Sequence, residues 1–321
     1  MEFIRYTVTK PTHGSQEWLN VRWRDEDGFT RISASVAGAV HNQGWGDTSM
    51  ADLAVQLLSD TAPEPIEANA AMDRGNRLEL PLLNWFADVE KMEILTPEIM
   101  YAYSTTDNKL RLIATLDGIT PNGIPVEIKT TKKMWTGVLP PMWRWQGIQQ
   151  AICVGSSRVE WGIFDSNLEL HRYTQHISSD EMQDHLSACR AFLSATDRGE
   201  IPTGADLTYK HVAELHPKGN AVRKECDPEI AGQLVADLET SRRLKAEAEE
   251  WEDKLKKEIA LLLGDADTGC INGEPFVTWK SATRESFDST KFSAMHPALA
   301  EKFRKTTSYR VMRITNKKGA K

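Results

Sequence analysis

Two carboxylates and a lysine are gathered around a tight turn in the middle of the chain. Residues 114–131 read ATLDGITPNGIPVEIKTT, and the Pro-Asn-Gly segment predicts a hairpin. Side chains alternate along a strand, so Glu127 and Lys129 share one face, and we expect Asp117 to end the preceding strand beside them. Close carboxylates repel, a divalent cation relieves that repulsion, and a lysine can assist an attacking water. The stretch predicts either a metal-centred hydrolytic site or chance polar residues on an ordinary hairpin.

Any metal in such a site is expected to be a hard cation held by oxygen atoms. The four cysteines are far apart and include no C-x-x-C pair, and the eight histidines show no H-x-x-x-H spacing. These patterns argue against a zinc ribbon, an iron–sulfur cluster and a disulfide scaffold. Mg²⁺ or Mn²⁺ is therefore expected in preference to zinc.

Composition places the chain among globular proteins. Its 321 residues are 40% hydrophobic and 26% charged, which suits one large domain with an appendage or two domains. No stretch approaches the roughly 20 apolar residues that cross a bilayer. The start, MEFIRYTVTKPTHG, lacks the apolar core of a signal peptide. We therefore expect a cytoplasmic protein without a membrane partner.

Charge is distributed unevenly. The net charge of -7 alone speaks against a general nucleic-acid binder. Residues 280–321, however, carry eleven Lys and Arg against three acidic residues, so the rest of the chain is more acidic than the total. A basic tail on an acidic body is typical of a polyanion contact, a subunit contact or a solvated surface.

The order of predicted elements indicates an α/β (α+β) protein. Strands are expected between residues 91 and 176, beginning with residues 91–95, and helices precede, interrupt and follow them, which predicts a mixed sheet flanked by helices. We place this core at residues 1–205 and a C-terminal extension at 206–321. In the extension, a long amphipathic helix is expected over 228–263, followed by a basic hairpin, a helix and a strand over 270–321.

Three further segments carry residues suited to phosphate or metal chemistry. RGNRLE places Glu79 near the start of an apolar helix, and WRWQG places Gln146 on the helix after the hairpin. Near the N-terminus, Arg22 follows a tryptophan, and the later RISAS segment contains Ser35. Arginine and hydroxyl groups suit a phosphate. Taken singly, each segment is equally typical of a solvated surface.

Taken together and in this order, the segments resemble the phage lambda-type alkaline exonucleases, a family also called YqaJ-like viral recombinases. That family belongs to the PD-(D/E)xK nuclease superfamily. The matching motifs are W…R…[ST]AS, RGxxxE, DG…ExK and Q…G, spread over roughly residues 15 to 180. Leu116 stands where the superfamily name has proline, at a position that is not a ligand, and the link between Arg22 and RISAS is longer than expected.

The resemblance implies a restriction-endonuclease-like core and a set of site residues. As Mg²⁺ ligands, for two ions with Mn²⁺ able to substitute, it implies Asp117, Glu127, Glu79 and the Ile128 carbonyl. As catalytic residues it implies Asp117, Glu127, Lys129, Glu79 and Gln146. As the pocket for a 5′-terminal phosphate it implies Arg22, Ser35 and Thr115.

The same resemblance implies an activity and partners. The expected activity is Mg²⁺-dependent 5′→3′ digestion of one strand of linear duplex DNA from a 5′-phosphorylated end, leaving a 3′ overhang for phage-type recombination. A ring-shaped homotrimer, a single-strand annealing protein as partner, and a phage or prophage origin in a bacterial host are also implied. Two alternatives stay open: a structure-specific or restriction-like endonuclease, and a non-catalytic module that binds DNA ends or a partner.

Tryptophans beside the catalytic strand offer a further DNA contact. The segment KKMWTGVLPPMWRWQ holds three of the ten tryptophans of the chain. We expect Trp143 within it to contact DNA and the segment to help split the duplex end.

Overall fold

The computed structural model describes residues 2–46, 48–59, 62–65, 67, 69–219, 221–306 and 309–314. The chain divides into two compact units, Met1–His216 and Pro217–Lys321. The sequence placed the division after residue 205. It falls later because α6 (Tyr209–Leu215) belongs to the first unit, where His211 Nε2 lies 3.0 Å from Asp52 Oδ1 on α2 (Met50–Leu58).

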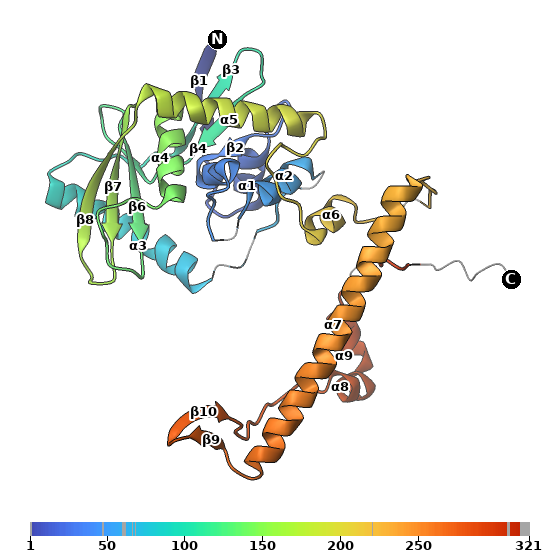
Figure 1. The fold of residues 1–321 in the computed structure, drawn as a ribbon. Coiled ribbons are helices and arrows are strands. Elements are labelled where there is room, and N and C mark those ends of the chain that lie inside the picture. The colour runs from blue at the N-terminus through green and yellow to red at the C-terminus, as the bar shows by residue number, and fades with distance from the viewer. Residues whose placement is uncertain are drawn as a thin grey trace. The chain divides into compact units, whose positions relative to one another are not determined.

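Two four-stranded sheets form the first unit (Figure 1). One sheet has the order β1-β3-β4-β2, with strands Phe3–Thr9, Ile99–Thr105, Arg111–Ala114 and Ile32–Ser33. The other has the order β5-β6-β7-β8, with strands Gly118–Ile119, Pro125–Thr130, Arg158–Phe164 and Leu170–His176. In the first sheet β2 runs parallel to β4, and in the second β6 runs parallel to β7. The predicted mixed α/β class is confirmed.

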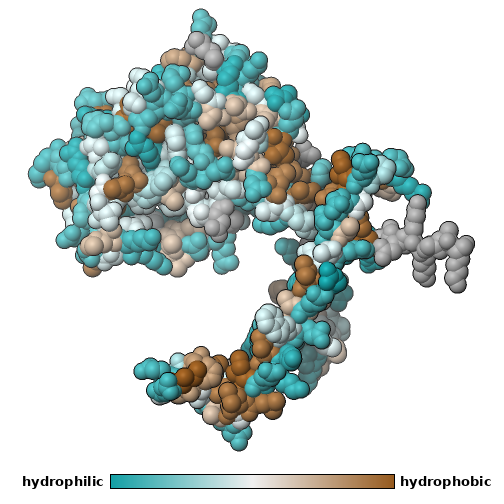
Figure 2. Space-filling view, in the orientation of Figure 1, coloured by the Kyte–Doolittle hydropathy of each residue, from teal (hydrophilic) through white to brown (hydrophobic). Residues whose placement is uncertain are grey.

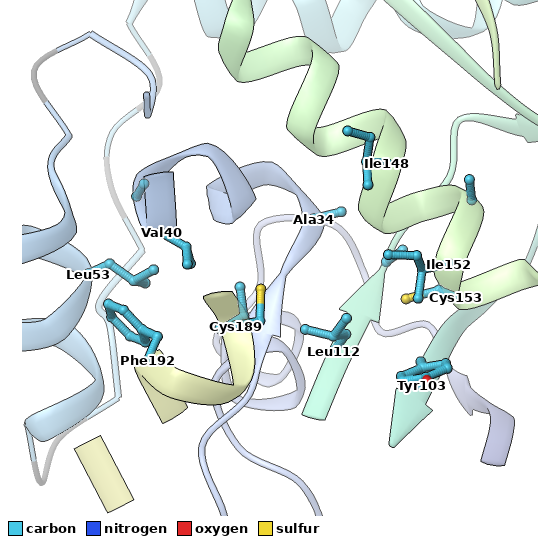
Figure 3. Close-up of a cluster of buried hydrophobic side chains, with 14 of the residues drawn as sticks. Ala34, Val40, Leu53, Tyr103, Leu112, Ile148, Ile152, Cys153, Cys189 and Phe192 are labelled. Carbon is cyan, nitrogen blue, oxygen red and sulfur yellow. The ribbon is translucent and has the colours of Figure 1, made fainter. Parts of the chain in front are cut away.

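Helix α4 (Pro141–Val154) packs against strands of both sheets (Figure 1). Proline at its first position and Gly155 in the left-handed conformation after it delimit the helix. Figure 3 shows Ile148 and Ile152 of α4 in one cluster with Leu112 of β4. Because α4 is enclosed on several sides, its residues 146–153 are all buried and polar ones among them face polar partners.

The other helices of this unit pack on the sheets or on α4. Helices α1 (Gln16–Trp23) and α3 (Ala70–Glu90) contact strands, the 3₁₀ helix η1 (Ala34–His41) and α5 (Ser179–Asp197) pack on α4, and α2 packs on η1, α5 and α6. Val126 and Ile128 of β6 pack under α3 against Phe86 and its neighbours. Strand alternation then turns Glu127 and Lys129 to the other face of the sheet, as the sequence predicted.

Two predicted strand features are wrong. Asp117 does not end a strand that pairs with β6, because β4 ends at Ala114 in the other sheet and the hairpin partner of β6 is the short β5. Residues 91–94 form no strand, and Leu95 makes a single bridge to Ile119. The chain instead crosses from one sheet to the other between β4 and β5.

The second unit contains one long helix and small elements around it. Helix α7 (Pro228–Leu263) covers the predicted range, is capped by the Asp227 carboxylate, and ends at Gly264. Hairpin strands β9 (Thr268–Ile271) and β10 (Glu274–Thr278) follow, and then helices α8 (Ser289–Met295) and α9 (Pro297–Lys302). Apolar side chains along α7 remain open to solvent, as Figure 2 shows for this unit; Trp251 is 66% exposed.

The predicted last strand of the extension, at residues 308–315, is not found. Residues 309–314 form no strand, and residues 308 and 315 lie outside the described residues. Within the described part of the chain, no helix is both long enough and apolar enough to cross a bilayer.

Candidate active site

The structure brings Asp117, Glu127 and Lys129 together at the edge of the second sheet. Asp117 lies just before β5, and its Oδ2 accepts a hydrogen bond of 2.8 Å from the Ile128 backbone N–H. On the adjacent face of β6, the Lys129 ammonium donates to Glu127 Oε1 at 2.5 Å. The predicted cluster of two carboxylates and one ammonium therefore exists.

Helix α4 fixes both oxygens of Glu127. Gln146 Nε2 donates to Oε1 at 2.6 Å, and Gln150 Nε2 donates to Oε2 at 2.6 Å. Residues four apart lie on one face of a helix, so the two amides reach the same carboxylate. Glu127 is only 2% exposed. The sequence predicted Gln146 but missed Gln150, although the four-residue spacing of the two glutamines was a readable signal.

Burial and like charge dominate the electrostatics. Burial, with the negative charges of Glu127 and Glu79, raises the pKa of Asp117 well above its usual range. Burial and the charge of Glu127 also raise the pKa of Glu79 on α3. Burial alone would lower the pKa of Lys129, but the charges of Glu127 and Asp117 outweigh it and raise that pKa. Three acidic groups thus surround Lys129, with Lys10 acting on Glu79 as well, and a cation would further relieve the repulsion among the carboxylates.

The donor set fits a hard cation in its chemistry, although its present geometry is not that of a ligand cage. Among the residues that the structure describes, no three His, Cys, Asp or Glu side chains are arranged to hold a metal ion. The oxygens of Glu127 face N–H donors instead. Three oxygen atoms nearby nevertheless lie buried without a partner: Thr115 Oγ1, Gln146 Oε1 and Gln150 Oε1. Water molecules of a hydrated cation could donate to them.

The Ile128 carbonyl lies on the expected edge of β6. In a strand, the N–H and C=O of one residue leave on the same side. The Ile128 N–H points at Asp117, while β5 pairs with Val126 and Pro125 rather than with Ile128. The carbonyl of Ile128 is therefore on the Asp117 side, where the resemblance placed it.

A second polar group surrounds Arg22 of α1. Its guanidinium donates to the Ser33 hydroxyl at 2.8 Å and to the Ser35 hydroxyl, and it lies 4.0 Å from the centroid of the Trp18 ring. Burial lowers the pKa of Arg22 to about 10. Within the described ranges, Arg22 makes no ion pair with a carboxylate. A largely buried guanidinium between two hydroxyls is suited to an anion from outside.

Thr115 connects the two groups through the backbone. Strand β2 pairs with β4 so that Ser33 lies opposite Ile113, two residues before Thr115. On the other side, Gln150 Nε2, which holds Glu127, lies 3.4 Å from the Thr115 carbonyl oxygen. Residues predicted to bind phosphate thus adjoin those predicted to bind metal. Ser33, the first residue of the [ST]AS motif, is a further hydroxyl on Arg22 that the predicted phosphate pocket did not include.

Structural comparisons find exonucleases. An alkaline exonuclease, LHK-Exo from Laribacter hongkongensis, matches with 20% identity and a TM-score of 0.43, over 57% of this chain and 93% of that chain. A phage-related exonuclease from Haemophilus somnus 129PT matches with 10% identity and a TM-score of 0.37, over 51% of this chain and 94% of that chain. No protein-family model and no curated protein matches the sequence.

The prediction that Trp143 contacts DNA is not supported by its position. Trp143 is only 5% exposed, belongs to the main hydrophobic cluster and stacks on Trp161 with 6.2 Å between ring centroids. The helix that carries Trp143 is covered by η1 and by both sheets, so this ring is enclosed. Trp143 therefore packs in the hydrophobic core.

Proposed function

We propose that the protein is an Mg²⁺-dependent exonuclease that digests one strand of linear duplex DNA in the 5′→3′ direction from a 5′-phosphorylated end. One observation carries the proposal: besides the cluster of Asp117, Glu127 and Lys129, the same unit holds Arg22, a guanidinium without a carboxylate partner among the described residues. The two groups are linked through the pairing of β2 with β4 and through the Thr115 backbone. Hydrolysis of a phosphodiester needs the first group, and recognition of a strand end by its phosphate needs the second.

The residues of the chain have separable tasks in this reaction. Lys129, held against Glu127, can orient or activate the attacking water and place positive charge beside the scissile phosphate. Gln146 and Gln150 hold the Glu127 carboxylate, and the Ile128 N–H holds that of Asp117. When bound, Mg²⁺ would activate water and neutralise charge on the phosphate and leaving oxygen. Two ions per site, with Mn²⁺ able to substitute and Glu79 serving the second, are part of the proposal.

Arg22, the Ser33 and Ser35 hydroxyls and Thr115 form the proposed 5′-phosphate clamp. A terminal phosphate monoester carries more charge than an internal diester, so a guanidinium lacking an internal counter-ion favours the end over the interior of a strand. This clamp favours an exonuclease over a structure-specific or restriction-like endonuclease, because an endonuclease has no use for it. The intact acidic cluster favours an enzyme over a non-catalytic end-binding module.

The proposed assembly is a ring-shaped homotrimer that encloses the DNA. A ring is compatible with the net charge of -7, because only its inner lining has to be basic. Light scattering should then give about three times the chain mass of 36.1 kDa. A mass of one chain would refute the trimer without bearing on the chemistry.

The 3′ overhang suits recombination by strand annealing. We propose a single-strand annealing protein as the partner and the unit Pro217–Lys321 as its docking site. Exposed apolar side chains on α7 support a protein contact there. Phage or prophage origin is part of the same proposal.

One assay separates the candidate functions. The protein is incubated with linear duplex carrying or lacking a 5′ phosphate and with closed circular duplex, each with Mg²⁺ or with chelator. The proposal predicts Mg²⁺-dependent loss of the phosphorylated linear duplex and survival of the circle. Cleavage of the circle would establish an endonuclease, and no digestion of any substrate would favour a binding module.

A further inference from the structure

An exposed tryptophan lies directly beside the proposed catalytic lysine. The Lys129 ammonium is 5.5 Å from the ring centroid of Trp45, within cation–π range. Trp45 is 41% exposed, while Trp143, 6.1 Å away between centroids, is buried beneath it. The site therefore has one open aromatic surface at the point where the phosphate must react.

Hydrogen bonds hold the loop that carries Trp45 between η1 and α2. The Gln43 N–H donates to the Gly38 carbonyl at 2.8 Å, and the Gln43 side chain accepts from Trp145 Nε1 of α4 at 2.7 Å. The Thr48 N–H donates to the Trp45 carbonyl at 2.9 Å. Because α4 also holds Glu127, the ring and the acidic cluster are positioned by the same helix.

Packing alone does not explain this placement. A tryptophan that served only the core would be expected to bury most of its ring, as Trp143 does. Trp45 instead keeps a large exposed surface next to a charged side chain. Nucleobases stack on such surfaces whatever their identity, and a base lies only a few bonds from its own 5′ and 3′ phosphates.

We propose that Trp45 stacks on the base of the 5′-terminal nucleotide and so holds its 3′ phosphodiester at Lys129. This inference rests on the proposed function, since it assigns a subsite of the same centre. Stacking on an aromatic side chain is sequence-tolerant and contributes on the order of 5- to 150-fold per base. The subsite thus grips the terminal nucleotide without reading sequence.

The kinetic test uses two substrates and a matched control. Linear 5′-phosphorylated duplexes carry either a normal or an abasic 5′-terminal nucleotide. Trp45→Ala should lower kcat/KM on the normal end by about 10- to 100-fold. Trp45→Phe should restore most of that loss. On the abasic end, wild type and Trp45→Ala should cleave equally slowly. Trp85→Ala, at a 44% exposed tryptophan on α3, should leave both rates unchanged. An equal loss on both ends, or no loss, would overturn the subsite.

A binding test separates this inference from the proposed reaction. With chelator present, 2-aminopurine at the 5′ terminus should lose fluorescence when wild type binds the duplex and keep it with Trp45→Ala. Quenching without any cleavage in Mg²⁺ would retain the stacking site and reject the exonuclease. Cleavage without Trp45-dependent quenching would retain the exonuclease and reject the stacking site.

Discussion

Gln150 of α4 donates a hydrogen bond of 2.6 Å to Glu127 of β6, one helical turn beyond the corresponding bond from Gln146. Both oxygens of a carboxylate that is 2% exposed are therefore fixed by primary amides. Amides can satisfy the carboxylate without neutralising it, so its negative charge is retained for a cation. The helix and the strand are joined at the centre of the candidate site.

Replacing Gln150 by methionine should impair cleavage more than folding. The change keeps the length of the side chain and removes the donor to Glu127 Oε2. Because partners that orient a metal-binding carboxylate typically matter about 10- to 100-fold, kcat on linear duplex should fall by that factor. Gln233→Met, on an exposed turn of α7, is the control and should be silent. Full activity of Gln150→Met, with circular dichroism unchanged, would remove this residue from the site.

Replacing Arg22 by methionine should abolish the preference for a 5′ phosphate. The lost charge-assisted bonds predict a rise in KM of about 10- to 100-fold on phosphorylated ends and little change on hydroxyl ends. Initial rates on the two duplexes measure the ratio. Arg77→Met, at an exposed pair with Asp73, is the matched control. A phosphate preference that survives in Arg22→Met would place the clamp elsewhere.

Gly147→Ala and Gly75→Ala should change stability in opposite directions. A Cβ at Gly147 would collide with the Gln175 side-chain oxygen and approach Trp161 Cζ2 to 2.8 Å, so overpacking should cost about 1–3 kcal/mol. A Cβ at Gly75 of α3 meets nothing within 4 Å, and alanine should there stabilise the helix by about 0.5–1 kcal/mol. Urea unfolding measures both. Equal effects would contradict the packing of α4 described above.

Acid should destabilise the fold through two stacked histidines. The His41 and His185 rings meet at 2.9 Å between Nε2 and Nδ1, and His185 Nε2 donates to Gln149. The Gln149 amide has this orientation because its nitrogen donates to the Ile32 and Ile113 carbonyls, so its oxygen is the atom that faces His185. His185 Nδ1 must then accept from His41, which keeps His185 neutral.

Burial lowers the pKa of His41 to about 4, against a raising effect of Asp184, and that of His185 to about 3. Below pH 6.5, the ordinary pKa of histidine, the unfolded chain thus binds more protons than the folded chain. The contribution of these histidines to the free energy of unfolding is therefore complete above pH 6.5 and falls as the pH drops. His185 should contribute a slope of up to about 1.4 kcal/mol per pH unit. Urea unfolding between pH 7 and pH 5 measures it, and His185→Gln should flatten the curve. A slope unchanged in that variant would refute the assignment.

Local patterns in the sequence were sufficient for part of the site. Alternation along β6 and the turn before it predicted that Glu127 and Lys129 share a face, and their meeting with Asp117 follows from the short β5 hairpin. For the N-terminal arginine, residue chemistry suggested a phosphate, and the resemblance suggested a 5′-terminal one. Its link to the acidic cluster depends on β2 lying beside β4, a pairing of segments about 80 residues apart that no local pattern encodes.

The central position of α4 explains the error at Trp143. Most of α4 is buried between the sheets and η1, so exposure could not be read from periodicity and Trp143 was assigned to the surface. The one signal for Gln150 was its four-residue spacing from Gln146, which places the two amides on one face of the helix. β1 was missed because the strand lies at the edge of its sheet and is mostly exposed, without a clear alternation.

Release of the 5′-terminal mononucleotide tests the central claim most directly. A 5′-labelled linear duplex is incubated with Mg²⁺ and either wild type or Lys129→Met, whose folding is checked by circular dichroism. We predict labelled mononucleotide from wild type and a rate at least about 100-fold lower from the variant, because the lysine acts on the attacking water. Equal release by the two proteins, or labelled products longer than the terminal nucleotide, would contradict the assignment of Asp117, Glu127 and Lys129 as an exonuclease centre.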